Sequence, residues 1–144
     1  DRFLMRISLG YPDRAAEREL LSGRDRREMA NTLRPLVSPQ DLAELQQQVL
    51  AVHASDPLLN YVQDLIAATR SGRWFLQGLS PRAGIALVRA AKAQALICGR
   101  DYVAPDDVQA IVAQTIAHRL VPVGDAGRGA VEQVHAMVAA VDLP

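Results

Sequence analysis

The feature that most constrains this chain is a serine–proline signal that recurs three times, each time followed by apolar residues at helical spacing. The signals are Ser38-Pro39, Ser55-Asp56-Pro57 and Ser80-Pro81. A serine side chain accepts a hydrogen bond from the free N–H groups of a first helical turn, and proline is well tolerated there because its missing N–H is not needed. Each signal therefore predicts the start of a helix.

Apolar residues behind these signals recur every three or four positions, which is the spacing of one helix face. Helices are expected over residues 39–52, 56–69 and 81–98, with a fourth opening at Pro105 and a last short one over 131–141. Only 4% of the residues are aromatic, so Ala, Leu, Val and Ile must build the core. The face of the third helix is mostly small and includes Gly84, Leu87, Ala91, Ala95 and Cys98. The sequence predicts an all-α helical bundle.

The first residues have a different pattern. The run from Phe3 to Leu9 is short and apolar, and it ends at the breaker Gly10-Tyr11-Pro12, which predicts a buried strand. One strand cannot make a sheet, and the chain does not begin with Met. We therefore expect residues 1–12 to be the end of a truncated α/β domain, residues 13–37 to form a helix capped by Asp13 and a linker, and residues 38–144 to form the helical domain.

Composition narrows the classes of function. Sixteen basic and sixteen acidic residues cancel, whereas a protein that binds nucleic acid through phosphates usually carries a basic excess, so no nucleic-acid partner is expected. The single cysteine, Cys98, excludes an intrachain disulfide and fits a reducing compartment, which predicts a cytoplasmic location. No uncharged apolar run approaches the roughly 18 residues that a membrane span needs.

Catalytic and metal-binding motifs are missing from the sequence. It contains no Gly-rich phosphate loop, no His-Glu-x-x-His, no cysteine pair and no Gly-x-Ser-x-Gly. His53, His118 and His135 fall in three separate predicted segments without ligand spacing, so no metal site is expected. The chain alone is therefore not expected to be an enzyme.

Arg82 is the one residue whose position suggests a ligand. It lies in the first turn behind Ser80-Pro81, where free N–H groups and the helix dipole already favour negative charge. A cation there opposes the dipole, and an anionic ligand such as a nucleotide phosphate would resolve the conflict. Arg89 lies on nearly the same face. An ordinary solvated surface arginine is the alternative for Arg82, and Trp74 and Phe75 are expected to plug the end of the bundle.

Three blocks of sequence resemble MoxR-type AAA+ ATPases, in the order that family has them. Residues 1–6, Asp-Arg-Phe-Leu-Met-Arg, with Gly10-Tyr11-Pro12, resemble the end of the nucleotide-binding core. Residues 78–83, Gly-Leu-Ser-Pro-Arg-Ala, resemble the sensor 2 segment. Residues 99–108, with His118-Arg119-Leu120, resemble later helices of the lid. Ala104 departs from the pattern, because a Ser or Thr cap would be natural before Pro105 unless Asp106 and Asp107 compensate.

This resemblance implies a C-terminal lid portion that folds over ATP and Mg²⁺ held by the preceding core, in a homo-oligomeric ring, a hexamer, of neighbouring subunits. Arg82 would be the sensor 2 arginine, reaching the γ-phosphate of its own subunit, and Arg2 the arginine finger, acting in trans on the adjacent subunit. The full protein would couple ATP hydrolysis to chaperone-like remodelling of client proteins, with von Willebrand factor A domain proteins as partners. The fragment alone would bind no cofactor.

Two other classes of function compete with the ATPase lid. The first is a free-standing helical adaptor that binds partner proteins through an apolar groove, and the second is a DNA-binding helical domain built from short helices and tight turns. Zero net charge weighs against DNA binding. The orphan strand and the missing initial Met favour the ATPase lid over the adaptor.

Overall fold

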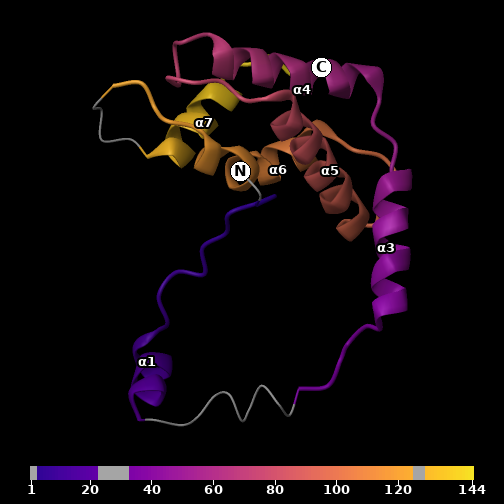
Figure 1. The fold of residues 1–144 in the computed structure, drawn as a ribbon, viewed down its shortest axis with the longest axis vertical. Coiled ribbons are helices and arrows are strands. Elements are labelled where there is room, and N and C mark those ends of the chain that lie inside the picture. Colours follow the sequence, from indigo (N-terminus) through magenta and orange to yellow (C-terminus); the bar gives the residue numbers. More distant parts are fainter. Residues whose placement is uncertain (1–2, 23–32, 125–128) are drawn as a thin grey trace.

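The computed structural model describes residues 3–22, 33–124 and 129–144, and the regular elements in these ranges are helices (Figure 1). In chain order they are α1 (Arg14–Leu21), α3 (Pro39–Ala51), α4 (Asp56–Arg70), α5 (Pro81–Ile97), α6 (Pro105–Ile116), the 3₁₀ turn η1 (Ala117–Arg119) and α7 (Ala130–Val138). Each predicted helix is present within a few residues of its expected ends. The prediction of an all-α helical bundle is confirmed.

Serine caps begin α3, α4 and α5 as the start signals predict. The hydroxyl oxygens of Ser38, Ser55 and Ser80 each accept a hydrogen bond from the backbone N–H three residues later, at 3.1, 3.4 and 3.4 Å. At α3 the cap is reciprocal, because the carboxylate of Asp41 accepts a hydrogen bond from the Ser38 N–H at 2.8 Å. These bonds satisfy N–H groups that would otherwise lack a partner, so they fix where each helix begins.

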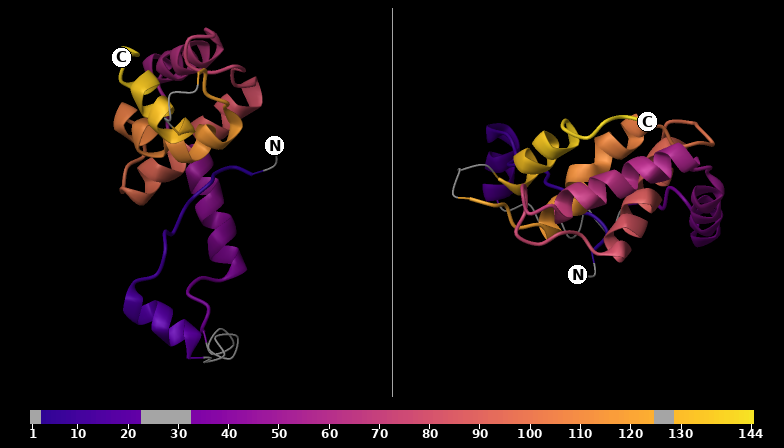
Figure 2. Two further views of the ribbon diagram at one scale, coloured as in Figure 1. Left: turned by 90° about the vertical axis from the view of Figure 1, so that its left-hand side faces the viewer. Right: turned by 90° about the horizontal axis from the view of Figure 1, so that it is seen from above.

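Helix α5 is the centre of the bundle. It packs against α3, α4 and α6, and α6 packs in turn against α7 (Figure 2). Leu87, Ala91 and Ala95 of α5 are completely buried, as the small-residue face predicts. At Gly84 a Cβ atom would lie 2.5 Å from Cδ1 of Ile66, so the missing side chain lets α4 come close. Cys98 was expected on the same buried face but is exposed, because α5 ends at Ile97.

Two short backbone ties hold the ends of the bundle together. The His53 N–H donates to the Asp101 carbonyl at 2.7 Å, and the Val103 N–H donates back to the His53 carbonyl at 2.9 Å. At the other end Phe75 forms an isolated antiparallel bridge with Pro122. Phe75 is only 1% exposed, so the prediction that it plugs the bundle is confirmed.

The N-terminal segment departs from the buried strand expected over residues 3–9. It is an extended stub with exposed apolar side chains, and no strand is assigned in residues 3–22 (Figure 1). One backbone bond ties it to the bundle, from the Arg6 N–H to the Gln114 carbonyl at 2.8 Å. Among the described residues the apolar run has no neighbouring strand to pair with, so no ladder forms there.

Helices α1 and α3 form as expected but contribute little to the core. Both lie away from the rest of the bundle, and only the end of α3 reaches it (Figures 1 and 2). Leu42 and Leu45, which recur at helical spacing on one face of α3, are 50% and 42% exposed, whereas Val52 just after α3 is buried. None of the described helices is both long and apolar enough to cross a membrane.

Candidate functional site

The start of α5 is held by a clamp from the end of α4. The Thr69 hydroxyl accepts a hydrogen bond from the Leu79 N–H at 3.0 Å and donates one to the Ile66 carbonyl at 2.6 Å. Arg70 donates through Nε and Nη2 to the Leu79 carbonyl, at 2.9 and 2.7 Å. Both polar groups of the residue before the Ser80 cap are therefore bound, and the first turn of α5 is fixed relative to α4.

Gly78 makes this clamp possible. A Cβ atom at residue 78 would lie 2.8 Å from the Arg70 Cα and still closer to its side chain. Such distances do not occur between real side-chain and backbone atoms, so any larger residue must displace either Arg70 or the loop. The glycine in the segment that resembles sensor 2 is therefore explained by a close approach of two backbones.

Arg82 lies two residues behind the cap, in the first turn of α5, and its side chain is exposed. It lines a cleft of about 230 Å³ together with Arg89 from the same helix and Arg119 from η1. Ile85 and Ala86 supply apolar lining between the two α5 arginines, and Phe3 and Leu4 of the stub complete it. The cleft thus gathers three guanidinium groups, from segments far apart in sequence.

Arg119 is the most restrained of these arginines. It is half-buried, and its Nη2 donates to the Phe3 carbonyl at 2.5 Å and to the Leu4 carbonyl at 3.5 Å. Its Nε donates to Nε2 of the neighbouring His118 at 3.3 Å. Burial, and then the positive charge of Arg82, lower the pKa of the Arg119 guanidinium. The two arginines are therefore close enough for their charges to interact.

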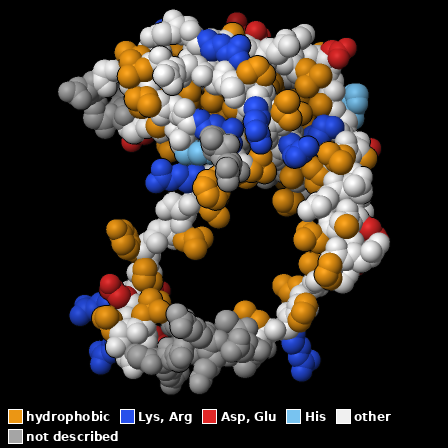
Figure 3. All heavy atoms as spheres, viewed as in Figure 1, with side chains coloured by type: hydrophobic (Ala, Val, Ile, Leu, Met, Phe, Trp, Pro, Cys, Tyr) orange, Lys and Arg blue, Asp and Glu red, His pale blue; other side chains and the backbone are white. Residues whose placement is uncertain are grey.

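The face of the bundle that Figure 3 shows is rich in basic side chains. Basic side chains gather over it with apolar side chains between them, and acidic side chains lie mainly along the edges of the view. The formal charges of the whole chain cancel, so this face is a local excess rather than a general one. A concave surface lined with positive charge attracts anions.

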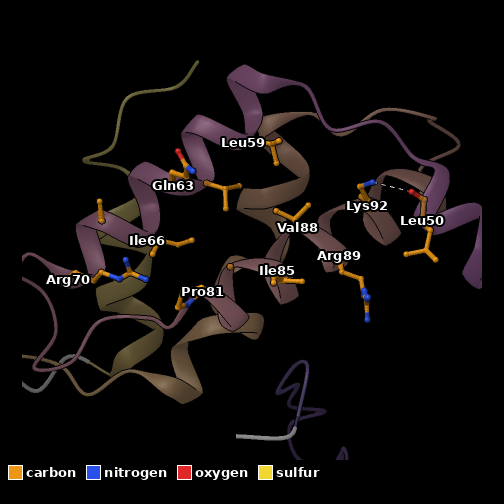
Figure 4. A pocket seen from close by; sticks show the side chains of 13 residues that line it. Leu50, Leu59, Gln63, Ile66, Arg70, Pro81, Ile85, Val88, Arg89 and Lys92 are labelled. Carbon is orange, nitrogen blue, oxygen red and sulfur yellow. Dashed lines mark hydrogen bonds between the residues drawn. The ribbon is translucent and has the colours of Figure 1, made fainter.

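A second hollow is apolar. It has a volume of about 750 Å³ and lies between α4 and α5, near the end of α3 (Figure 4). Leu59, Ile66 and Val88 line it, and Lys92 closes one end by donating to the Leu50 carbonyl at 3.1 Å. Its lining contains no acidic residue and no histidine. This groove can bury apolar side chains, but it offers little for catalysis.

The three histidines do not gather at one place in the fold. His53 is exposed in the loop after α3, whereas His118 and His135 line one hollow of about 660 Å³ with Arg6 and Glu132. Within residues 3–22, 33–124 and 129–144, no three His, Cys, Asp or Glu side chains lie together in a way that could hold a metal ion. Arg2, the expected arginine finger, lies outside the described residues.

Sequence comparison decides the family of the chain. The family model of the AAA lid domain matches residues 67–138, which include α5, α6, α7 and the three arginines that line the cleft. The chain belongs to the AAA lid domain family. The segment that resembles sensor 2 and the block around residues 99–108 both lie within the matched part of this AAA lid.

Two relatives of the chain carry the MoxR name. The chain is 35% identical over 138 residues to the chaperone MoxR1 of Mycobacterium tuberculosis, covering 88% of the chain and 35% of MoxR1. It is 34% identical to the protein MoxR of Paracoccus denitrificans, covering 83% and 41%, and 38% identical to YeaC, an uncharacterized protein of Bacillus subtilis, covering 83% and 38%. The resemblance to MoxR-type AAA+ ATPases is therefore confirmed.

One solved structure supports the same assignment. A crystal structure of a candidate ATPase from Cytophaga hutchinsonii matches with a TM-score of 0.80 and 29% identity, over 99% of this chain and 47% of that one. The chain spans between 35% and 41% of the length of the curated relatives it matches.

Proposed function

We propose that this AAA lid closes over ATP and Mg²⁺ bound by a nucleotide-binding core, and that Arg82 acts as its sensor 2 arginine on the γ-phosphate of its own subunit. Residues 1–12 would be the end of that core, residues 13–37 a helix and linker, and residues 38–144 the lid. By itself the lid would not hydrolyse ATP, since its sequence has no phosphate loop.

One observation supports this role above the others. Arg82 projects from a helix start that is capped by Ser80 and clamped by Thr69 and Arg70, and it lines the cleft that it shares with Arg89 and Arg119. Phosphoryl transfer leaves the protein mainly positioning and charge neutralisation to do. A guanidinium on a rigid helix start is suited to that task, because its backbone is already fixed and its planar fork can pair with phosphate oxygens.

Beyond the single subunit, we propose a homo-oligomeric ring, a hexamer, in which Arg2 reaches the nucleotide of the adjacent subunit as an arginine finger. An arginine finger supplies about 10³–10⁵ in rate. The ring would use this hydrolysis to remodel client proteins in the cytoplasm, with von Willebrand factor A domain proteins as partners. The chaperone name of MoxR1 supports a client-remodelling role.

The test of the sensor 2 role is ATP turnover by the full-length protein with Arg82→Gln. We expect turnover to fall about 10-fold or more, as when one charged hydrogen bond to a transition state is removed, while the melting temperature stays unchanged. Arg73→Gln is the matched control, because Arg73 stacks over the Trp74 ring at 4.8 Å and does not line the cleft. Unchanged turnover in Arg82→Gln would remove Arg82 from the nucleotide site.

The finger role of Arg2 requires a mixing experiment. Arg2→Ala subunits, which lack the finger but keep Arg82, are mixed with Arg82→Gln subunits, which keep the finger. If Arg2 acts in trans, an Arg82→Gln subunit can serve the intact site of an Arg2→Ala neighbour, so mixed rings should turn over ATP faster than the average of the two unmixed proteins. Turnover that equals this average would show a defect confined to the altered subunit and would exclude the finger role.

The apolar groove favours a second candidate function, a protein-interaction adaptor without nucleotide function. Its 750 Å³ volume and its Leu59, Ile66 and Val88 lining could bury apolar side chains of a partner. Val88→Asp and Arg82→Gln distinguish the two functions in a client-remodelling assay. The adaptor function predicts loss with Val88→Asp only, whereas the ATPase lid predicts loss with Arg82→Gln.

A further inference from the structure

We propose that Arg119 is a second cationic ligand of the phosphate assigned to Arg82, so that guanidinium groups from η1 and α5 grip the terminal phosphates of one nucleoside triphosphate. This inference rests on the proposed function of Arg82. It adds Arg119 of η1 to the proposed phosphate site of Arg82. It also assigns a ligand, the terminal phosphate, to the cleft that Arg82, Arg89 and Arg119 line.

Geometry places the two residues in one site. Arg82 and Arg119 line the same cleft of about 230 Å³, and the positive charge of Arg82 helps to lower the pKa of Arg119. Two like charges that line one cleft destabilise it when it is empty, and burial of Arg119 reduces the water that would screen them. A multiply charged anion between the two guanidinium groups would turn this repulsion into attraction to a shared ligand.

The size of the cleft restricts what it can hold. Sites that enclose a drug-sized ligand have volumes of about 300–1,000 Å³, so 230 Å³ suits a phosphate group whose nucleotide is held elsewhere. Guanidinium forks match phosphate oxygens in pairs, and the cationic lining of this cleft is arginine alone. Arg89 also lines the apolar groove, so we place it at the mouth of the cleft rather than on the phosphate.

Backbone contacts hold Arg119 in place. The bonds from its Nη2 to the Phe3 and Leu4 carbonyls, and from its Nε to His118, orient the plane of the guanidinium beside the cleft. Such prior ordering lowers the entropic cost of binding a phosphate. The same contacts suit a purely structural role, in which Arg119 only holds the N-terminal segment against the lid. The experiment must distinguish this role from phosphate binding.

The experiment compares ATP and ADP binding by the full-length protein, using fluorescent analogues of each nucleotide. The variants are Arg119→Gln, Arg82→Gln and their combination, with Arg73→Gln as the control. For Arg119→Gln we expect affinity for ATP to fall about 10-fold and affinity for ADP to fall less than about 2-fold, because the lost ligand faces the terminal phosphate. The double variant should lose less than the product of the single losses, since both residues share one phosphate.

Several outcomes would overturn the inference. Equal losses for ATP and ADP, or a lowered melting temperature with unchanged affinities, would show that Arg119 only fastens the stub. Loss of ATP preference in Arg82→Gln but not in Arg119→Gln would leave the proposed function standing and remove Arg119 from it. Preserved ATP preference in both variants would contradict both proposals.

A second variant covers the case in which Arg119→Gln fails to fold. Arg119→Lys keeps the charge and can still donate to the Phe3 carbonyl, but it lacks the fork that could bind this carbonyl and a phosphate together. We expect Arg119→Lys to fold and to lose part of its preference for ATP. Full ATP preference in Arg119→Lys would contradict a bidentate phosphate contact and would overturn the inference.

Discussion

Arg100 donates through both terminal nitrogens to the carboxylate of Asp107, at 2.6 and 2.5 Å, across the start of α6. The same carboxylate accepts a hydrogen bond from the Ala104 N–H at 2.8 Å. Ala104 occupies the cap position of α6 and has no side-chain oxygen to offer. Asp107 therefore supplies the reverse half of a capping box, although the side chain of Ala104 cannot supply the other half, and Arg100 neutralises a carboxylate that is only 3% exposed.

Replacement of Asp107 by Ala should lower the stability of the lid by about 2 kcal/mol, because it removes charged hydrogen bonds from a buried position. Urea unfolding followed by circular dichroism measures this change. Asp106→Ala is the matched control, since Asp106 is exposed in the same helical turn and interacts mainly with the dipole. Equal effects of the two substitutions would mean that the ion pair contributes nothing beyond the dipole.

Acid should weaken the lid through the same residue. The hydrogen bonds from Arg100, and then the one from Ala104, hold the pKa of Asp107 below its ordinary value. A lowered folded-state pKa stabilises the fold above the unfolded pKa of about 3.9, and this stabilisation is lost as the pH falls through the lowered pKa. Unfolding free energies measured between pH 7 and pH 2 should fall more steeply in the wild type than in Asp107→Asn. Parallel curves would contradict this role of Asp107.

Gly78→Ala should disturb the start of α5. The added methyl group would meet the Arg70 backbone, so either the bonds from Arg70 to the Leu79 carbonyl break or the loop moves. We expect a loss of about 1–3 kcal/mol in stability and a smaller preference for ATP in the full-length protein. Gly129→Ser is a suitable control, because a Cβ at Gly129 meets nothing within 4 Å and a serine there could cap α7. Wild-type stability of Gly78→Ala would contradict the clamp.

The helices could be predicted correctly because short stretches of neighbouring residues determine where they begin and which face is apolar. A Ser-Pro pair specifies a cap and a first turn from neighbouring residues alone, so the starts of α3 and α5 are right. The inward face of α6, with Val108, Ile111, Val112 and Thr115, is likewise buried as its spacing predicts. Arg82 was also predicted to lie at a helix start, and it does.

Features that depend on distant partners could not be predicted in this way. Leu42 and Leu45 repeat at helical spacing, but spacing does not say whether another surface covers them. Arg119 joins Arg82 only because η1 follows α6 back toward the start of α5, and no pattern in the sequence records that approach. Arg100 lies in the loop between α5 and α6, whereas Asp107 lies in the first turn of α6. Because the backbone between them is not regular, neither helical nor strand spacing predicts that they pair.

The central claim is that the Arg82 guanidinium meets the terminal phosphate of the nucleotide bound by its own subunit. The most direct measurement is a structure of the full-length protein with a non-hydrolysable ATP analogue and Mg²⁺. Our account predicts that a terminal nitrogen of Arg82 lies about 3 Å from a γ-phosphate oxygen of the nucleotide in the same subunit. An Arg82 side chain that stays in solvent while the analogue is fully bound would contradict the account.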